Sequence, residues 1–160
     1  MHLIEVVINR SAAMKRVERA TWKQGRILDQ PKSAKQVYNM QADTGEANSD
    51  QPLLRDMFGR WAWACVDIVR EYLRDVPGYP EKPDQEHDPE DFIIPLRMPE
   101  NWVIKEREGL QSEMIELVHN GMMADWYDDT NPERSATYKK KAEANKAEIH
   151  STIYALNAPE

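Results

Sequence analysis

One pair of residues has a spacing that metal sites use. Glu116 and His119 stand three positions apart in a segment with helical periodicity, so both side chains project from one helix face. Di-iron carboxylate bundles combine two such pairs with further inward carboxylates, and the sequence has no second Glu-x-x-His. We therefore interpret Glu116 as solvent-facing and His119 as a residue at the edge of the core. A helical metal-binding protein or enzyme that uses this pair is the alternative, with further ligand candidates at His150, Asp67 and Glu71.

A row of basic side chains is the strongest candidate for a binding surface. The period of the predicted helix over 11–28 places four cations on one stripe: Arg16, Arg19, Lys23 and Arg26. Residues 1–35 hold eight basic and three acidic groups, whereas the rest of the chain holds thirteen basic and twenty-five acidic ones. Such a stripe fits an acidic protein surface, including one on another copy of the chain. A nucleic-acid-binding module is the alternative, which the net charge of −7 and the absence of a reader motif disfavour.

The sequence lacks the residue patterns of other catalytic and cofactor-binding sites. No Gly-rich phosphate loop, dinucleotide fingerprint or Gly-x-Ser-x-Gly elbow occurs in the sequence. Cys65 is the only cysteine; it falls in an apolar helical stripe, where we expect a small buried side chain. The acidic, Pro-rich segment 77–91 lacks the glycine-centred pattern of a calcium loop. We therefore expect no cofactor, no metal and no catalytic residue.

The composition predicts one soluble domain over residues 1–160. Of these residues 41% are hydrophobic, enough for a chain of this length to bury a core without cross-links. No apolar run approaches the ~20 residues that a membrane-spanning helix needs, and the first ten residues lack the layout of a secretory signal. We therefore expect a cytoplasmic location and no membrane contact.

The hydrophobic periodicity predicts four helices. The first covers 11–28, and the second covers 53–74, whose aromatic-rich face we place at the centre of the core. The third runs over 106–127, and a short turn leads into the fourth, with Thr130 or Asn131 as N-cap. Because that connection is short, the last two helices should form an antiparallel αα-hairpin.

A small β element should accompany the helices. Apolar residues alternate over 92–98, which predicts a strand with one buried face; Pro95 lacks a ladder donor and so places it at an edge. Its partner is 35–40 or 2–8, and the latter fits either a strand or the start of the first helix. The expected fold class is therefore mainly α: a four-helix bundle-like domain with a C-terminal αα-hairpin and a two-stranded β element. We expect 77–91 to be an exposed loop.

The C-terminal part of the sequence carries a family pattern. A helix ends in Trp126-Tyr127, a turn follows at Asn131-Pro132-Glu133, and a long Ala/Lys/Glu-rich helix carries Tyr138 and Ile153-Tyr154. Over residues 53–157 this pattern resembles phage and prophage structural proteins of the head–tail connector (adaptor) kind. The resemblance implies a non-catalytic protein of virion assembly, a connector or tail-completion component that works as a ring. Its partners would be other copies of itself and other virion proteins.

Overall fold

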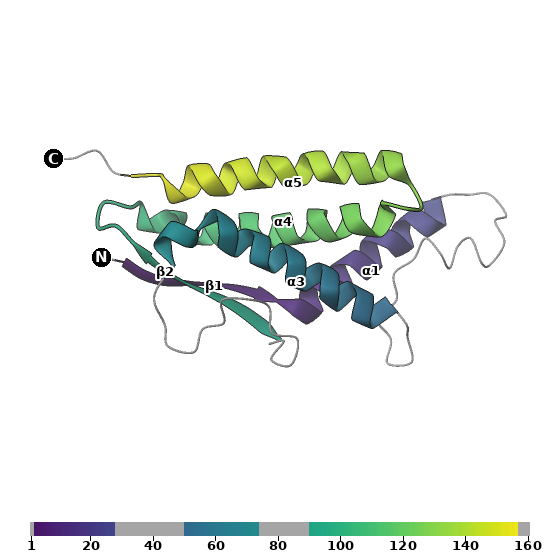
Figure 1. Cartoon of the computed structure of the whole chain (residues 1–160), viewed down its shortest axis with the longest axis horizontal. Coiled ribbons are helices and arrows are strands. Elements are labelled where there is room, and N and C mark those ends of the chain that lie inside the picture. The colour runs from purple at the N-terminus through teal and green to yellow at the C-terminus, as the bar shows by residue number, and fades with distance from the viewer. Residues whose placement is uncertain (1, 28–49, 74–89, 157–160) are drawn as a thin grey trace.

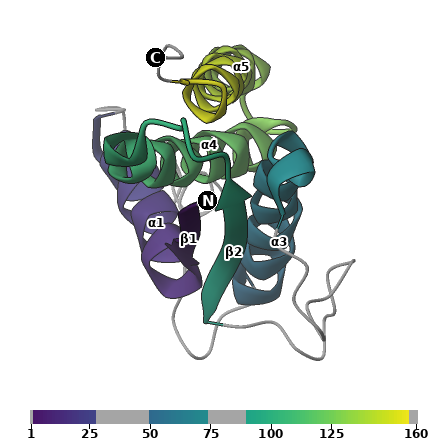
Figure 2. The same ribbon diagram turned by 90° about the vertical axis from the view of Figure 1, so that its left-hand side faces the viewer.

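Four helices and a small sheet make up the part of the chain that the structure describes. The computed structural model describes residues 2–27, 50–73 and 90–156, with side chains at 2–21, 52–73 and 90–156. In chain order the elements are β1 (His2–Asn9), α1 (Arg10–Ile27), α3 (Asp50–Ile68), η1 (Arg70–Tyr72), β2 (Asp91–Met98), η3 (Ile104–Glu106), α4 (Arg107–Tyr127) and α5 (Pro132–Ile153). The predicted class, mainly helical with a two-stranded sheet, is confirmed. Figures 1 and 2 show α5 over α4, and α4 across the sheet, with α1 and α3 on the two sides of the strands.

The sheet joins the beginning of the chain to its middle. β1 pairs antiparallel with β2, and the pairs Ile4–Leu96 and Val6–Ile94 face the core. The segment 2–8, which fitted either a strand or a helix, is therefore a strand, and its partner is 92–98. The alternative partner, 35–40, lies outside the described residues. Asn9 ends the strand and begins α1, because its Oδ1 accepts a hydrogen bond from the Ala12 amide at 2.8 Å.

Pro95 fits the strand because its nitrogen faces away from β1. The amide of Val7 donates to Oε1 of Gln111 on α4 at 3.0 Å, so this amide points out of the sheet. Along an antiparallel pair, residues whose backbone groups point toward the partner strand alternate with residues whose groups point away. Glu5 is two positions from Val7, so its backbone groups also point away, and so do those of Pro95, which stands opposite Glu5. The missing N–H of Pro95 therefore removes no hydrogen bond between the strands. The same Gln111 contact caps an amide on the open side of β1.

α4 is the central helix. From Leu117 to Ala124 every residue of α4 is buried, including the polar His119 and Asn120. A helix that is buried on all sides must be surrounded by other elements, and α4 lies against α1, α3, β1 and α5. The predicted place of the aromatic-rich face of the second helix in the core is confirmed, because Leu54, Phe58 and Cys65 of α3 are buried there, against α4.

Gly121 allows α3 and α4 to approach closely. A Cβ atom at this position would lie 2.1 Å from Cδ2 of the Trp61 side chain on α3. Only a hydrogen fits where the indole ring covers the helix backbone. The indole is held in place by its own hydrogen bond, from Nε1 to Oδ2 of Asp125 at 2.8 Å.

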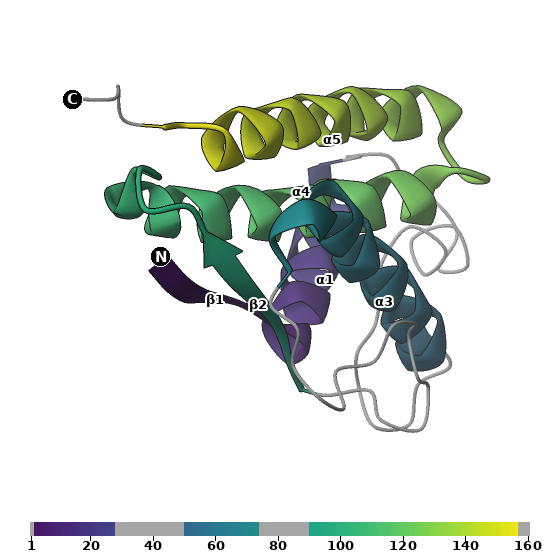
Figure 3. The ribbon, with the colours of Figure 1, turned by 60° about the vertical axis from the view of Figure 1, so that its left-hand side comes forward.

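The predicted αα-hairpin is confirmed. α4 and α5 run antiparallel along their length (Figure 3), and Asn131 is the N-cap of α5, accepting a hydrogen bond from the Arg134 amide at 3.1 Å. Oγ of Ser135 donates to the carbonyl of Ala124 at 2.8 Å. Further along, Asn120 donates to Asn145, at 2.7 Å. These polar contacts fix the register of the two helices.

Several predicted helix boundaries differ from the observed ones. The second helix differs most, since it ends at Ile68 and not at 74 and begins at Asp50 and not at 53; the first covers Arg10–Ile27 and not 11–28, and the third begins at Arg107 and not at 106. After Ile68 the chain continues as the short 3-10 helix η1. Leu73 then forms an isolated β-bridge with Leu96 of β2. Most of the predicted exposed loop 77–91 lies outside the described residues, although its last residue, Asp91, begins β2. None of the helices within the described ranges has both the length and the apolar character that crossing a bilayer requires.

Candidate functional site

The predicted basic stripe is divided by a contact inside the protein. Nη2 of Arg16 lies 2.8 and 3.0 Å from the two carboxylate oxygens of Glu116 on α4. Arg16 is thereby held against its own protein, while Arg19 is exposed. Lys23 and Arg26 belong to α1, but their side chains lie outside the described part. Lys15, one position before Arg16, is exposed next to Arg19. The outward cations with described side chains are therefore Lys15 and Arg19.

The same ion pair decides the environment of the Glu116 and His119 motif. The carboxylate of Glu116 is about 40% exposed and turned to Arg16, which agrees with a residue at the surface of α4. His119 is buried, and its ring meets that of Tyr138 edge to face, with 6.5 Å between the ring centroids. Its Nδ1 is buried without a hydrogen-bond partner.

Burial controls the protonation of His119. The pKa of this imidazole is lowered to about 4, mainly by desolvation; the Arg16 and Lys141 cations also lower it, and Glu116 opposes them. The ring is therefore neutral near pH 7. A neutral imidazole with a buried lone pair or N–H is suited to metal binding or proton transfer only if other reactive groups converge on it.

The additional ligand candidates are held in other contacts. Asp67 pairs with Arg70 at 2.6 Å, and Glu71 accepts a hydrogen bond from the hydroxyl of Tyr154 at 2.9 Å. The ring of His150 packs on the same tyrosine, with 4.7 Å between centroids. Over residues 2–27, 50–73 and 90–156, no three His, Cys, Asp or Glu side chains are grouped so as to hold a metal ion.

Cys65 is a buried core residue, as its place in the apolar stripe predicted. Its thiol lies 3.7 Å from the carbonyl of Met114 on α4. Burial raises the pKa of the Cys65 thiol well above its usual range, so the reactive thiolate is disfavoured.

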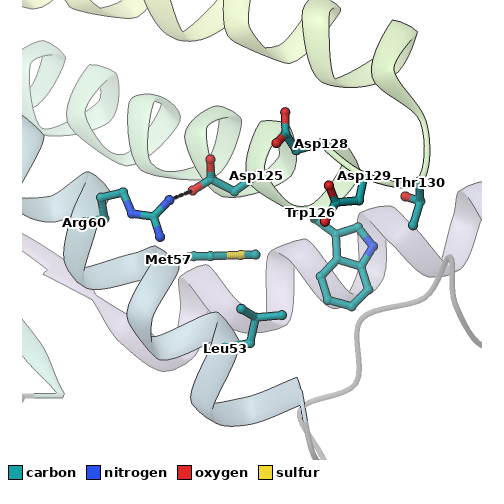
Figure 4. A pocket seen from close by; sticks show the side chains of 8 residues that line it. All are labelled: Leu53, Met57, Arg60, Asp125, Trp126, Asp128, Asp129 and Thr130. Carbon is teal, nitrogen blue, oxygen red and sulfur yellow. Dashed lines mark hydrogen bonds and ion pairs between the residues drawn. The ribbon is translucent and has the colours of Figure 1, made fainter.

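An open groove lies between the start of α3 and the turn from α4 to α5. It has a volume of about 370 Å³, and its apolar side chains come from both helices (Figure 4): Leu53, Met57 and Trp126. Leu53 is 47% exposed. Three carboxylates stand around this apolar floor, namely Asp125, Asp128 and Asp129.

Two of these carboxylates have basic neighbours. Asp125 lies 3.0 Å from Nη1 of Arg60 and also accepts from the Trp61 indole. Asp128 pairs with Lys139 at 3.1 Å, with both side chains about 60% exposed. Asp129 is exposed, and no ion pair or hydrogen bond of its side chain is found within the described part of the chain. The groove thus combines an apolar floor with an acidic rim.

Comparison with known proteins gives no relative. No protein-family model matches the chain, and no significant match to a curated protein or to a solved structure was found. The arrangement of its own side chains must therefore carry any functional inference.

Sequence reasoning did not find the groove. The acidic run after Trp126 indicated only a turn, and the apolar residues of α3 indicated only a core face. The groove exists only because the start of α3 lies next to the end of α4 and the following turn, and this placement is a tertiary property. The one local signal was the Asp128-Asp129 pair directly after an aromatic residue.

Proposed function

We propose that this chain is a non-catalytic structural protein that acts in assembly through protein–protein contacts, as a head–tail connector or tail-completion component of a phage or prophage. The observation that supports the proposal most is the groove with its exposed Leu53 and acidic rim. An open apolar surface ringed by charge is typical of a contact with another protein.

The hairpin pattern that carries the family resemblance gives further support. Trp126 contributes to the groove wall, whereas the adjacent Tyr127 is buried and stacks on Tyr138 with 6.1 Å between ring centroids. Tyr127 thus packs in the core, whereas Trp126 lines the groove at the surface. A turn built in this way presents its acidic residues on a rigid support.

The proposal is tested through the particle that the protein would build. We expect the gene to lie among capsid, portal or tail genes, and we expect mass spectrometry of gradient-purified particles to detect the protein. Deletion of the gene should leave capsids and tails that do not join, as seen by negative-stain electron microscopy, and a plasmid copy should restore joining. A gene in a metabolic operon, or particles that form normally without it, would contradict the proposal.

A metal-dependent function makes a different prediction. Protein purified without chelator would then contain stoichiometric metal by elemental analysis, and the double variant Glu116→Ala/His119→Ala would lose it. We expect no difference in metal content between wild type and this variant, because Arg16 holds the Glu116 carboxylate.

A further inference from the structure

We propose that the groove at the start of α3 receives the basic face of α1 from a second copy of this chain. The inference rests on the proposed assembly function and adds to it the two surfaces that meet and the occupant of the groove. The contact is head-to-tail, since each copy would offer its α1 to one neighbour and its groove to another.

The groove has a net negative rim. Its lining contains three aspartates and one arginine, Arg60, which is already shared with Asp125. The Asp128–Lys139 pair is exposed on both sides, and such surface pairs contribute little and exchange readily for another cation. Asp129 makes no described ion pair. Two carboxylates, Asp128 and Asp129, can therefore accept a basic side chain from outside.

The face of α1 supplies the complementary charge. Lys15 and Arg19 are exposed and four positions apart, so they lie one above the other on the helix. Neither makes an ion pair or hydrogen bond with any residue in the described ranges. The exposed Ala12 stands beside them, and its small side chain lets another surface approach the helix closely.

The ion pair between Arg16 and Glu116 determines which cations of α1 point outward. Because Arg16 turns to α4, the cations that remain outward are aligned in a single row and not spread around the helix. The outward basic row therefore differs from the predicted stripe: it includes Lys15, and it does not include Arg16, which is paired with Glu116.

Within one copy, the described cations of α1 are not paired with the carboxylates of the groove. Lys15 and Arg19 lie opposite Met14 and Val17, which are buried in the core, so the basic row points away from its own protein. α1 and α3 stand on opposite sides of the strands (Figure 2), and the groove lies between the start of α3 and the turn from α4 to α5. Within the described residues the basic row and the groove make no ion pair with each other, and a contact between copies gives a ring if the rotation closes.

Charge reversal on either surface tests the proposal. Arg19→Glu places an acid against the acidic rim, and Asp129→Lys places a cation against the basic row. By sedimentation velocity at low ionic strength, we expect wild type to associate and each variant alone to associate at least about tenfold more weakly. Wild-type association should also fall steeply on going to 1 M salt, where the screening length is ~3 Å.

Mixing the two variants provides the decisive measurement. In an equimolar mixture, the row altered by Arg19→Glu meets the groove altered by Asp129→Lys, and each unaltered row meets an unaltered groove. Association should therefore return to the wild-type level. Matched controls are Lys140→Glu and Glu148→Lys, which make charge changes of the same kind at exposed positions of α5. Both controls should associate as wild type does.

Several outcomes would overturn the proposal. They are wild type that stays monomeric at low salt, single variants that associate normally, and a mixture that does not recover. Loss of duplex-DNA binding in Arg19→Glu with unchanged self-association would assign the basic row to nucleic acid instead. Any of these results leaves the assembly function to be decided by the particle experiments, since a connector can also act through other proteins.

Discussion

At the scale of single residues, the fold depends on two positions in α4 where a small change has a large effect. Gly121 lies under the indole of Trp61, and His119 is buried as a neutral ring between α4 and α5. The first is a steric constraint and the second an electrostatic one. Both belong to the central helix, where the surrounding elements leave no room to adjust.

Gly121→Ala should destabilise the protein despite the better helix propensity of alanine. The new methyl group would lie 2.1 Å from the Trp61 ring, and relief requires the ring or the helix to move, at a cost of about 1–3 kcal/mol. Gly59→Ala on α3 is the matched control, because its Cβ would meet nothing within 4 Å; there we expect a gain of up to about 1 kcal/mol. Urea denaturation of both variants measures the difference, and equal effects would show that the close approach is not a constraint.

His119 should make stability depend on pH on the acid side. Its pKa is about 4 in the folded protein and ~6.5 in an unfolded chain, so the unfolded state binds the proton first as the pH falls. The stabilisation from neutral His119 is complete above pH ~6.5 and is lost as the pH falls to about 4, by about 3 kcal/mol.

The test compares the wild type with His119→Gln, which cannot gain this proton. Between pH ~7.5 and ~4, the unfolding free energy of the variant should fall by about 3 kcal/mol less than that of wild type. A proton NMR titration of the folded protein should give a midpoint near 4 for His119. A midpoint near ~6.5 together with parallel stability curves would refute the assignment.

At the scale of elements, local signals predicted some structures and tertiary contacts decided others. The alternation over 92–98 and the turn before Pro132 are short-range patterns, and both β2 and the hairpin follow them. The segment 2–8 carried no decisive pattern, because its strand depends on a partner far along the chain. The early end of α3 has no local breaker, and it coincides with the bridge from Leu73 to β2.

The candidate surfaces were predicted only in part. The row of cations on α1 was visible from its spacing, but the ion pair that removes Arg16 joins residues 100 positions apart and has no sequence signature. The central place of α4 was also not visible, because its buried run includes His119 and Asn120, two residue types that are mostly found at surfaces or half buried.

Asn131→Ala should weaken the start of α5. The side chain caps the Arg134 amide, and loss of an N-cap typically costs about 1 kcal/mol. Thr130→Ala, one position earlier and exposed, is the control and should change stability by less than about 0.5 kcal/mol. Thermal denaturation followed by circular dichroism distinguishes them; a larger loss in the threonine variant would place the cap at residue 130.

At the scale of the whole molecule, α4 contacts the three other helices and β1, so the described part should unfold as one unit. Met114 of α4 is fully buried, and Met114→Ala should cost about 2–5 kcal/mol. Helical circular dichroism and tryptophan fluorescence should report the same transition midpoint in wild type and variant. Leu53→Ala, which truncates an exposed groove residue, should be nearly neutral. Two separate transitions would mean that α5 or the sheet unfolds independently.

The pairing of β1 with β2 has a consequence for synthesis in the cell. Asn9 and its partner Asp91 are 82 positions apart, so at translation rates of ~5–20 residues per second the first strand waits roughly 4–16 s for its partner to be made. Throughout that interval the backbone groups of β1 that pair with β2 have no strand partner. We therefore expect slower decoding of the codons before residue 91 to lengthen the exposure of this strand to aggregation.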